Sequence, residues 1–144
     1  MRKTILFTTL FALSVFAAAC GSAGSSGPAA PTGKTIATGP AGNNLTAILS
    51  NLDGALKKGV QEFTLTFTDS SGKPVDVGSV ALNYRMAAMG SMSEMNTGAT
   101  FTTTGTPGVY KGKADIEMGG EWKAMITYEG AAGKNAFSIP VIAK

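Results

Sequence analysis

The sequence predicts an all-β domain, a two-sheet antiparallel sandwich of about seven strands, and three observations lead to this prediction. From Leu45 onward, apolar residues recur at every second position, which is typical of strands that bury one face. Clusters of turn-forming residues separate these runs at near-regular intervals. No long segment has the 3.6-residue period of a helix, so α/β folds are not expected.

The clearest strand is residues 62–68, in which Phe, Leu and Phe alternate with three threonines. An earlier strand is expected at residues 45–49, and residues 51–58 are a candidate helical turn. After the strand, the residues Asp, Gly and Pro within 69–74 indicate a turn. Each of these elements is short, as in sandwich domains.

The remaining strands are expected in order at residues 79–86, 99–104, 109–118, 121–129 and 135–142. Trp122 and Tyr128 share one face of their strand, and we expect them to pack in the core rather than bind a ligand. In the strand expected at residues 109–118, Asp115 and Glu117 share the outward face with lysines, so a solvated position is expected for both.

The N-terminal segment is typical of a secretory signal peptide. Arg2 and Lys3 precede an uncharged apolar run that ends at Cys20, the only cysteine of the chain. The run is too short for an ordinary transmembrane helix, which needs about 20 residues. The small residues 17–19 before Cys20 resemble the lipobox of bacterial lipoproteins, in which the cysteine carries lipid on its sulfur and its amine. The alternative is a plain secretory signal that leaves a free thiol.

Three parts of the chain follow from these observations: a signal peptide at residues 1–19, a lipidated Cys20 with a flexible linker through residue 44, and a β-sandwich domain at residues 45–144. The linker is expected to be flexible because its Gly, Ser, Ala, Pro and Thr residues bury little apolar surface. The alternative is that residues 35–38 pack as an extra edge strand.

Composition excludes several classes of function. The formal net charge is +3, and Arg2 and Lys3 in the leader account for much of it. No cluster of Lys and Arg remains that predicts binding to nucleic acid or to anionic lipid. The chain has no histidine and no cysteine pair, so the usual nucleophile–base pairs cannot form and no disulfide is possible. An enzyme is therefore not expected.

Four methionines stand at equal spacing, Met86, Met89, Met92 and Met95, and they are the candidate metal ligands. Thioether sulfur is a soft, neutral ligand that favours Cu(I) or Ag(I), whereas Cu(II) and Zn(II) sites normally use imidazole. The other interpretation is that Met86 belongs to the core. The remaining three would then cap one end of the sandwich or form an adaptable docking surface for a protein.

Several short motifs of this chain resemble the YtkA-like/FixH-like family. The matching motifs are Gly59, Phe63, Leu65 and Asp69 with Gly72–Val75, then Met86-Ala87-Ala88-Met89, Pro107-Gly108-Val109-Tyr110 and Met118-Gly119-Gly120-Glu121-Trp122. The resemblance implies an extracytoplasmic immunoglobulin-like antiparallel β-sandwich over about residues 45–142. It also implies partners that handle copper or export heavy metals, because such domains occur in copper-supply loci of cytochrome oxidase and in heavy-metal efflux adaptors.

The expected function is that of a lipid-anchored accessory protein that binds or hands over Cu(I) or Ag(I) through its methionine-rich loop. Its expected partners are a bacterial cell membrane, bound through Cys20, and a copper-handling or efflux protein of the envelope. The expected location is extracytoplasmic, on the periplasmic side or on the outer cell surface. The alternative function is a module that docks a transporter adaptor or an oxidase complex without metal.

Overall fold

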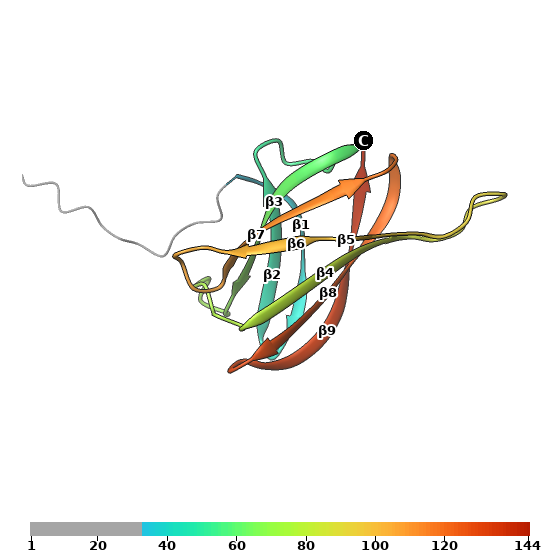
Figure 1. Ribbon diagram of the computed structural model, residues 1–144. Coiled ribbons are helices and arrows are strands. Elements are labelled where there is room, and N and C mark those ends of the chain that lie inside the picture. The colour runs from blue at the N-terminus through green and yellow to red at the C-terminus, as the bar shows by residue number, and fades with distance from the viewer. Residues whose placement is uncertain (1–32) are drawn as a thin grey trace, which may run out of the picture.

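A computed structural model describes residues 33–144, so the predicted signal peptide and Cys20 lie outside the described residues. The described chain folds into two antiparallel sheets that pack face to face (Figure 1). Residues 33–144 include no helix, and hence none that could span a bilayer. The predicted all-β sandwich is confirmed.

The described residues form nine strands rather than seven. The first sheet has the order β1-β2-β3-β7-β6, with β1 (Lys34–Gly42), β2 (Leu45–Asn51), β3 (Gly59–Thr68), β7 (Val109–Ile116) and β6 (Thr100–Thr103). The second sheet has the order β5-β4-β8-β9, with β5 (Met95–Gly98), β4 (Ser79–Met86), β8 (Gly120–Gly130) and β9 (Gly133–Ala143).

Strand β1 corrects the predicted domain boundary, because it lies inside the segment expected to be a linker. It pairs with β2 along its length, so residues 34–42 belong to the sheet. The structure therefore has the alternative, an edge strand that includes residues 35–38. The connection is a two-residue turn in which Asn43 and Asn44 both have positive φ, at 51° and 58°. This is the conformation of a type I′ turn, which Asn adopts more readily than most residues and which suits tight hairpins.

Two further elements differ from the sequence-based prediction. The strand expected at residues 99–104 is two short strands, β5 in one sheet and β6 in the other, joined at Ala99. Residues 52–58 contain bends rather than the candidate helical turn. Leu56, which is fully buried, forms a parallel bridge with Ala143 and so fixes this loop to the end of β9.

The core lies between the sheets and is rich in aromatic side chains. Phe67 makes edge-to-face contacts with Tyr110 and Tyr128, and Phe63 makes the same kind of contact with Tyr84. Edge-to-face pairs add about 0.5–1.5 kcal/mol each beyond the burial of their surface. Trp122 is also buried, so the expected core positions of Trp122 and Tyr128 are confirmed.

Candidate functional site

The four methionines lie on one hairpin that projects beyond the sandwich. Strands β4 and β5 pair from Asn83 with Gly98 to Met86 with Met95. Both arms then continue outward to a narrow tip, drawn in yellow in Figure 1, that extends clear of both sheets. The predicted loop at one end of the sandwich is therefore an extension of a β-hairpin.

Met89 and Met92 face each other across the turn at this tip. The Met92 N–H donates to the Met89 carbonyl at 2.9 Å, and the Met89 N–H donates to the Met92 carbonyl at 3.2 Å. Two residues that exchange both backbone bonds form a hydrogen-bonded pair, with Cα atoms about 5.5 Å apart. The two thioether side chains therefore start from neighbouring positions.

Gly90 makes this pairing possible. Its φ is +58°, while Ser91, the second central residue of the turn, has no positive φ. A positive φ at the first central position alone is typical of a type II′ turn, which prefers glycine there and matches the right-handed twist of the two strands.

A polar cluster of Arg85, Glu94 and Asn96 ties the two arms together where the hairpin leaves the sheet. The Glu94 carboxylate pairs with the Arg85 guanidinium and accepts a 3.0 Å hydrogen bond from Asn96 Nδ2. These contacts, Arg85 first, hold the pKa of Glu94 below its usual range. Both members of the ion pair are partly exposed, so the pair fixes the arms relative to each other more than it adds stability.

The structure divides the four methionines into two pairs rather than one set of four. Met89 and Met92 are 53% and 42% exposed at the tip, whereas Met86 is only 3% exposed and Met95 is partly buried. Met86 packs over Gly120, where a Cβ would approach its terminal methyl to 2.9 Å. Side chains alternate along a strand, so regular pairing would place the tip pair and the basal pair on opposite faces of the hairpin.

The tip pair is the part of the predicted site that solvent and partners can reach. Two neighbouring thioethers form a donor set that fits a soft monovalent ion and leaves it open to a further ligand. Residues 33–144 do not bring three His, Cys, Asp or Glu side chains together in a group that could hold an ion. The tip of the hairpin presents the thioethers of Met89 and Met92 to solvent.

The motif Asp69-Ser70-Ser71-Gly72-Lys73 builds a turn. Asp69 Oδ1 accepts hydrogen bonds from the Ser71 N–H at 2.8 Å, the Ser71 hydroxyl at 2.6 Å and the Lys73 N–H at 3.0 Å. These bonds, that of the Ser71 side chain first, lower the pKa of Asp69. Gly72 has a φ of +81°, which suits glycine at the end of such a turn.

The Pro-Gly-x-Tyr motif packs against the segment that follows this turn. Gly108 has a φ of +76°, and a Cβ there would lie 2.5 Å from the Val75 carbonyl oxygen. Its own carbonyl accepts the Phe67 N–H at 2.9 Å. Tyr110 then reaches back to residues 76 and 77. The glycine and the tyrosine of this motif therefore have structural roles at the end of the sandwich away from the methionine hairpin.

The third motif closes the end of the sandwich from which the hairpin leaves. Trp122 Nε1 donates a 3.1 Å hydrogen bond to the Met118 carbonyl, which fixes the turn between β7 and β8. Gly120, in the same motif, leaves the space that the methyl of Met86 fills. This motif therefore supports the base of the hairpin from inside.

The sequence-based reasoning missed Gly90 and the Arg85–Glu94–Asn96 cluster. The signal for the hairpin was present, because the methionines are spaced symmetrically about the dipeptide Gly90-Ser91. The cluster had no such signal, because its members become neighbours only once the register of β4 with β5 is known.

Comparison with known protein families gives a match. The model of the family described as YtkA-like matches residues 41–127, which run from the end of β1 into β8 and include the whole methionine hairpin. No curated protein matches the chain.

Proposed function

The chain belongs to the YtkA-like family, and on that premise we propose that it is an extracytoplasmic accessory protein that carries or hands over Cu(I) or Ag(I) at the tip of its methionine hairpin. Cys20, as a lipidated residue, would anchor it to the membrane. No catalytic step is part of the proposal.

The observation that carries the proposal is the reciprocal pairing of Met89 and Met92 at an exposed turn. A thioether binds a soft ion without losing a proton, so uptake and release need no change in pH. Two sulfur ligands on an exposed tip leave the ion accessible, which suits transfer to a partner better than storage. Met86, enclosed in the core, is a packing residue in this scheme, and Met95 supports the base of the hairpin.

An Ag(I) titration of the mature lipoprotein in nanodiscs, followed by the NMR signals of the methionine methyl groups, tests the proposal. We expect the Met89 and Met92 methyl signals to shift together and the Met86 signal to stay unchanged. Met125 is the matched control, because it is a 40% exposed methionine on β8 without a methionine across from it in either neighbouring strand. Equal shifts at Met125 and the tip pair, or no shift at either, would refute the proposal.

A second candidate is docking of an envelope partner, such as a transporter adaptor or an oxidase complex, without metal. It is favoured by the exposure of two large flexible apolar side chains on a projecting hairpin, since methionine adapts to varied surfaces. A photo-crosslinking residue at Ser91 would separate the two candidates in cells. Capture of one partner that persists under a Cu(I) chelator supports docking, and capture that disappears supports metal transfer.

A further inference from the structure

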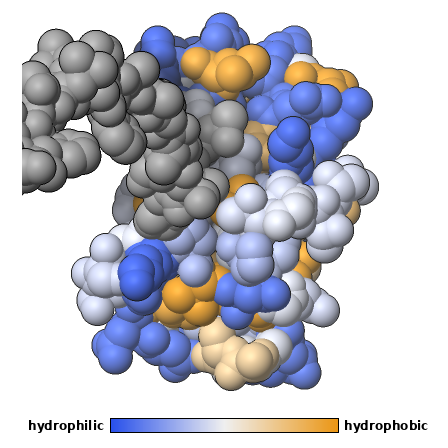
Figure 2. Space-filling model, turned by 90° about the vertical axis from the view of Figure 1, so that its left-hand side faces the viewer, coloured by the Kyte–Doolittle hydropathy of each residue, from blue (hydrophilic) through white to orange (hydrophobic). Residues whose placement is uncertain are grey.

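The end of the sandwich at which the described chain begins combines exposed apolar and basic side chains. We call it the end face and define it by Leu52, Val60 and Ile142 with Lys34, Lys57, Lys58 and Lys144. Leu52 is 84% exposed, and Val60 and Ile142, at 58% and 64%, face outward from the first and the second sheet respectively. In Figure 2, apolar side chains lie among strongly hydrophilic ones at this end, which is uppermost in both views.

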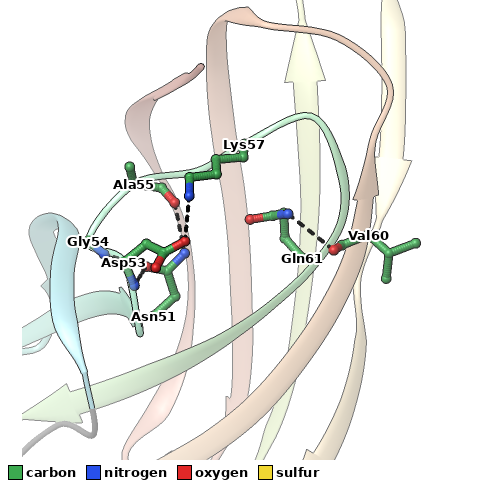
Figure 3. Close-up of polar contacts among 7 residues, drawn as sticks. All are labelled: Asn51, Asp53, Gly54, Ala55, Lys57, Val60 and Gln61. Carbon is green, nitrogen blue, oxygen red and sulfur yellow. Dashed lines mark hydrogen bonds and ion pairs between the residues drawn. The ribbon is translucent and has the colours of Figure 1, made fainter.

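Leu52 is held outward by a rigid loop. Asn51 Oδ1 accepts the N–H groups of Asp53 at 3.1 Å and Gly54 at 2.6 Å, and Asn51 Nδ2 donates to the Ala55 carbonyl at 2.8 Å (Figure 3). The buried Leu56 fixes the far side of the loop to β9. The exposure of Leu52 is therefore built into the loop and does not come from a loose segment.

Charge is distributed unevenly at this end. The start of β1, the loop and the last residue carry the four lysines and one acid, Asp53, which pairs with Lys57 at 2.6 Å. The nearby acids Asp115, Glu117 and Glu121 lie on the β7–β8 hairpin. Asp115 lies directly opposite Val60 in the pairing of β3 with β7, and Glu121 lies opposite Ile142 in the pairing of β8 with β9, whereas Lys34 lies opposite Asn51, next to Leu52. Leu52 therefore lies on the basic side of the end face.

The chain leaves the described structure beside the same loop. Gly33 packs so closely against the backbone of Asn51 that a Cβ at Gly33 would overlap the Asn51 carbonyl. Twelve residues, 21–32, separate Gly33 from Cys20, and even a fully extended chain of that length spans at most about 43 Å. A lipid on Cys20 would therefore keep the end face within reach of the membrane surface.

We propose that the end face rests on the surface of an anionic phospholipid bilayer, with Leu52 in the boundary between headgroups and acyl chains and the lysines beside lipid phosphates. The proposal depends on the proposed lipidation of Cys20, which supplies a high local concentration, so that weak contacts suffice to orient the domain. The sequence did not predict this surface, because Lys34, Lys144 and the pair Lys57-Lys58 are far apart in the chain and only the fold brings them together.

Docking of this kind would also place the methionine hairpin. Strand β8 begins at the end of the sandwich where β9 finishes. Near that start, Arg85 of β4 lies opposite Lys123 of β8 in the strand register. The hairpin therefore leaves the second sheet at the membrane-facing end. A docked domain would present Met89 and Met92 close to the bilayer surface, where a membrane-embedded partner could meet them.

Paramagnetic lipids test the proposal without altering the protein. The mature lipoprotein is placed in nanodiscs of phosphatidylcholine with or without phosphatidylglycerol, and nitroxide-labelled lipid is added. We expect the methyl signals of Leu52 to broaden several-fold more than that of Ala131, which is exposed in the β8–β9 turn at the opposite end. The difference should be larger in the anionic discs.

Charge variants supply the second readout. The double variant Lys57→Gln/Lys58→Gln should reduce the broadening at Leu52 at least two-fold in anionic discs, whereas Lys73→Gln, an exposed lysine at the opposite end, should not. Equal broadening at Leu52 and Ala131 in a protein that stays on the discs would overturn docking and leave the lipid anchor standing. A protein that fails to bind discs at all would overturn both, and the silver titration would remain a separate test of the hairpin.

Discussion

The Tyr110 hydroxyl donates a 2.9 Å hydrogen bond to Asp76 Oδ1 and accepts a 3.2 Å bond from the Val77 N–H, so one side chain fixes the entry to β4. These contacts connect two sequence motifs of the chain, since Tyr110 ends the Pro-Gly-x-Tyr motif and residues 76 and 77 follow the Gly-Lys-Pro-Val motif. Both motifs therefore act in building the sandwich.

Removing this hydroxyl in Tyr110→Phe should lower the free energy of unfolding by about 1–2 kcal/mol, because it leaves the Val77 N–H without its partner. The effect should depend on pH. Burial, and then the Asp76 carboxylate, raise the pKa of Tyr110 to about 12, against about 10 in an unfolded chain. The stabilisation is complete below pH 10 and is lost as the pH rises toward 12. Urea unfolding between pH 8 and 12 should show the wild type and variant converging.

Acid should weaken the turn at residues 69–73. The hydrogen bonds of Ser71 and Lys73 lower the pKa of Asp69, so its stabilising effect is present above the unfolded value of about 4 and is lost as the pH falls through the lower folded value. The variant Asp69→Asn keeps an acceptor oxygen but cannot titrate. Its thermal unfolding temperature should fall less steeply below pH 4 than that of the wild type, and equal slopes would contradict the assignment.

Gly108 should not tolerate a side chain. Its φ is +76°, and a Cβ would overlap the backbone of Val75, so we expect Gly108→Ala to cost about 2–4 kcal/mol of stability. Gly105, three residues earlier, has open space where a Cβ would lie and no positive φ, so Gly105→Ala is the matched control. Chemical denaturation of the two variants measures the difference.

The two methionine pairs should respond differently to truncation. Met86→Ala removes a core side chain and should cost about 2–5 kcal/mol, whereas Met86→Leu should cost less than about 1.5 kcal/mol. Met89→Ala, at the exposed tip, should leave stability within about 0.5 kcal/mol of the wild type. Denaturation curves check all three variants. A large loss of stability in Met89→Ala would show that the tip packs against another part of the protein, contrary to this prediction.

The turn at Gly90 should control the tip pair. An alanine there must adopt a φ near +58° in open space, so Gly90→Ala should cost about 1 kcal/mol and loosen the hairpin without disturbing the core. Hydrogen exchange of the Met89 and Met92 amides should become faster, and the shared Ag(I) shift should weaken. Gly98→Ala, in β5 with free space and no positive φ, should change neither measurement.

The predictability of the fold differs from element to element for physical reasons. Strands with strict alternation in sequence, such as those containing Phe63 and Trp122, could be placed from the sequence; the second buries one face only, whereas the threonines of the first are buried as well. Strand β1 could not, because its small residues carry little apolar pattern and its place is set by pairing with β2 and by the turn at Asn43-Asn44. The division at Ala99 was also invisible, since a change of sheet leaves no mark on alternation.

The candidate site was predictable in its residues and not in its geometry. Thioether chemistry alone singled out the four methionines. Whether they form one set of four or two pairs depends on the register of β4 with β5, which pairs Met86 with Met95 and places Met89 opposite Met92. The burial of Met86 follows from its place against Gly120, a contact between residues far apart in the chain.

The passage of the chain through Ala99 gives the hairpin a mechanical property. Its outgoing arm belongs to the second sheet, while its returning arm continues into the first, so the finger is rooted in both halves of the scaffold. A partner that binds the tip would meet a preorganised hairpin, so little binding free energy would be lost in ordering the hairpin. A force that pulls on the tip would be transmitted to both sheets and would not act on a single edge strand.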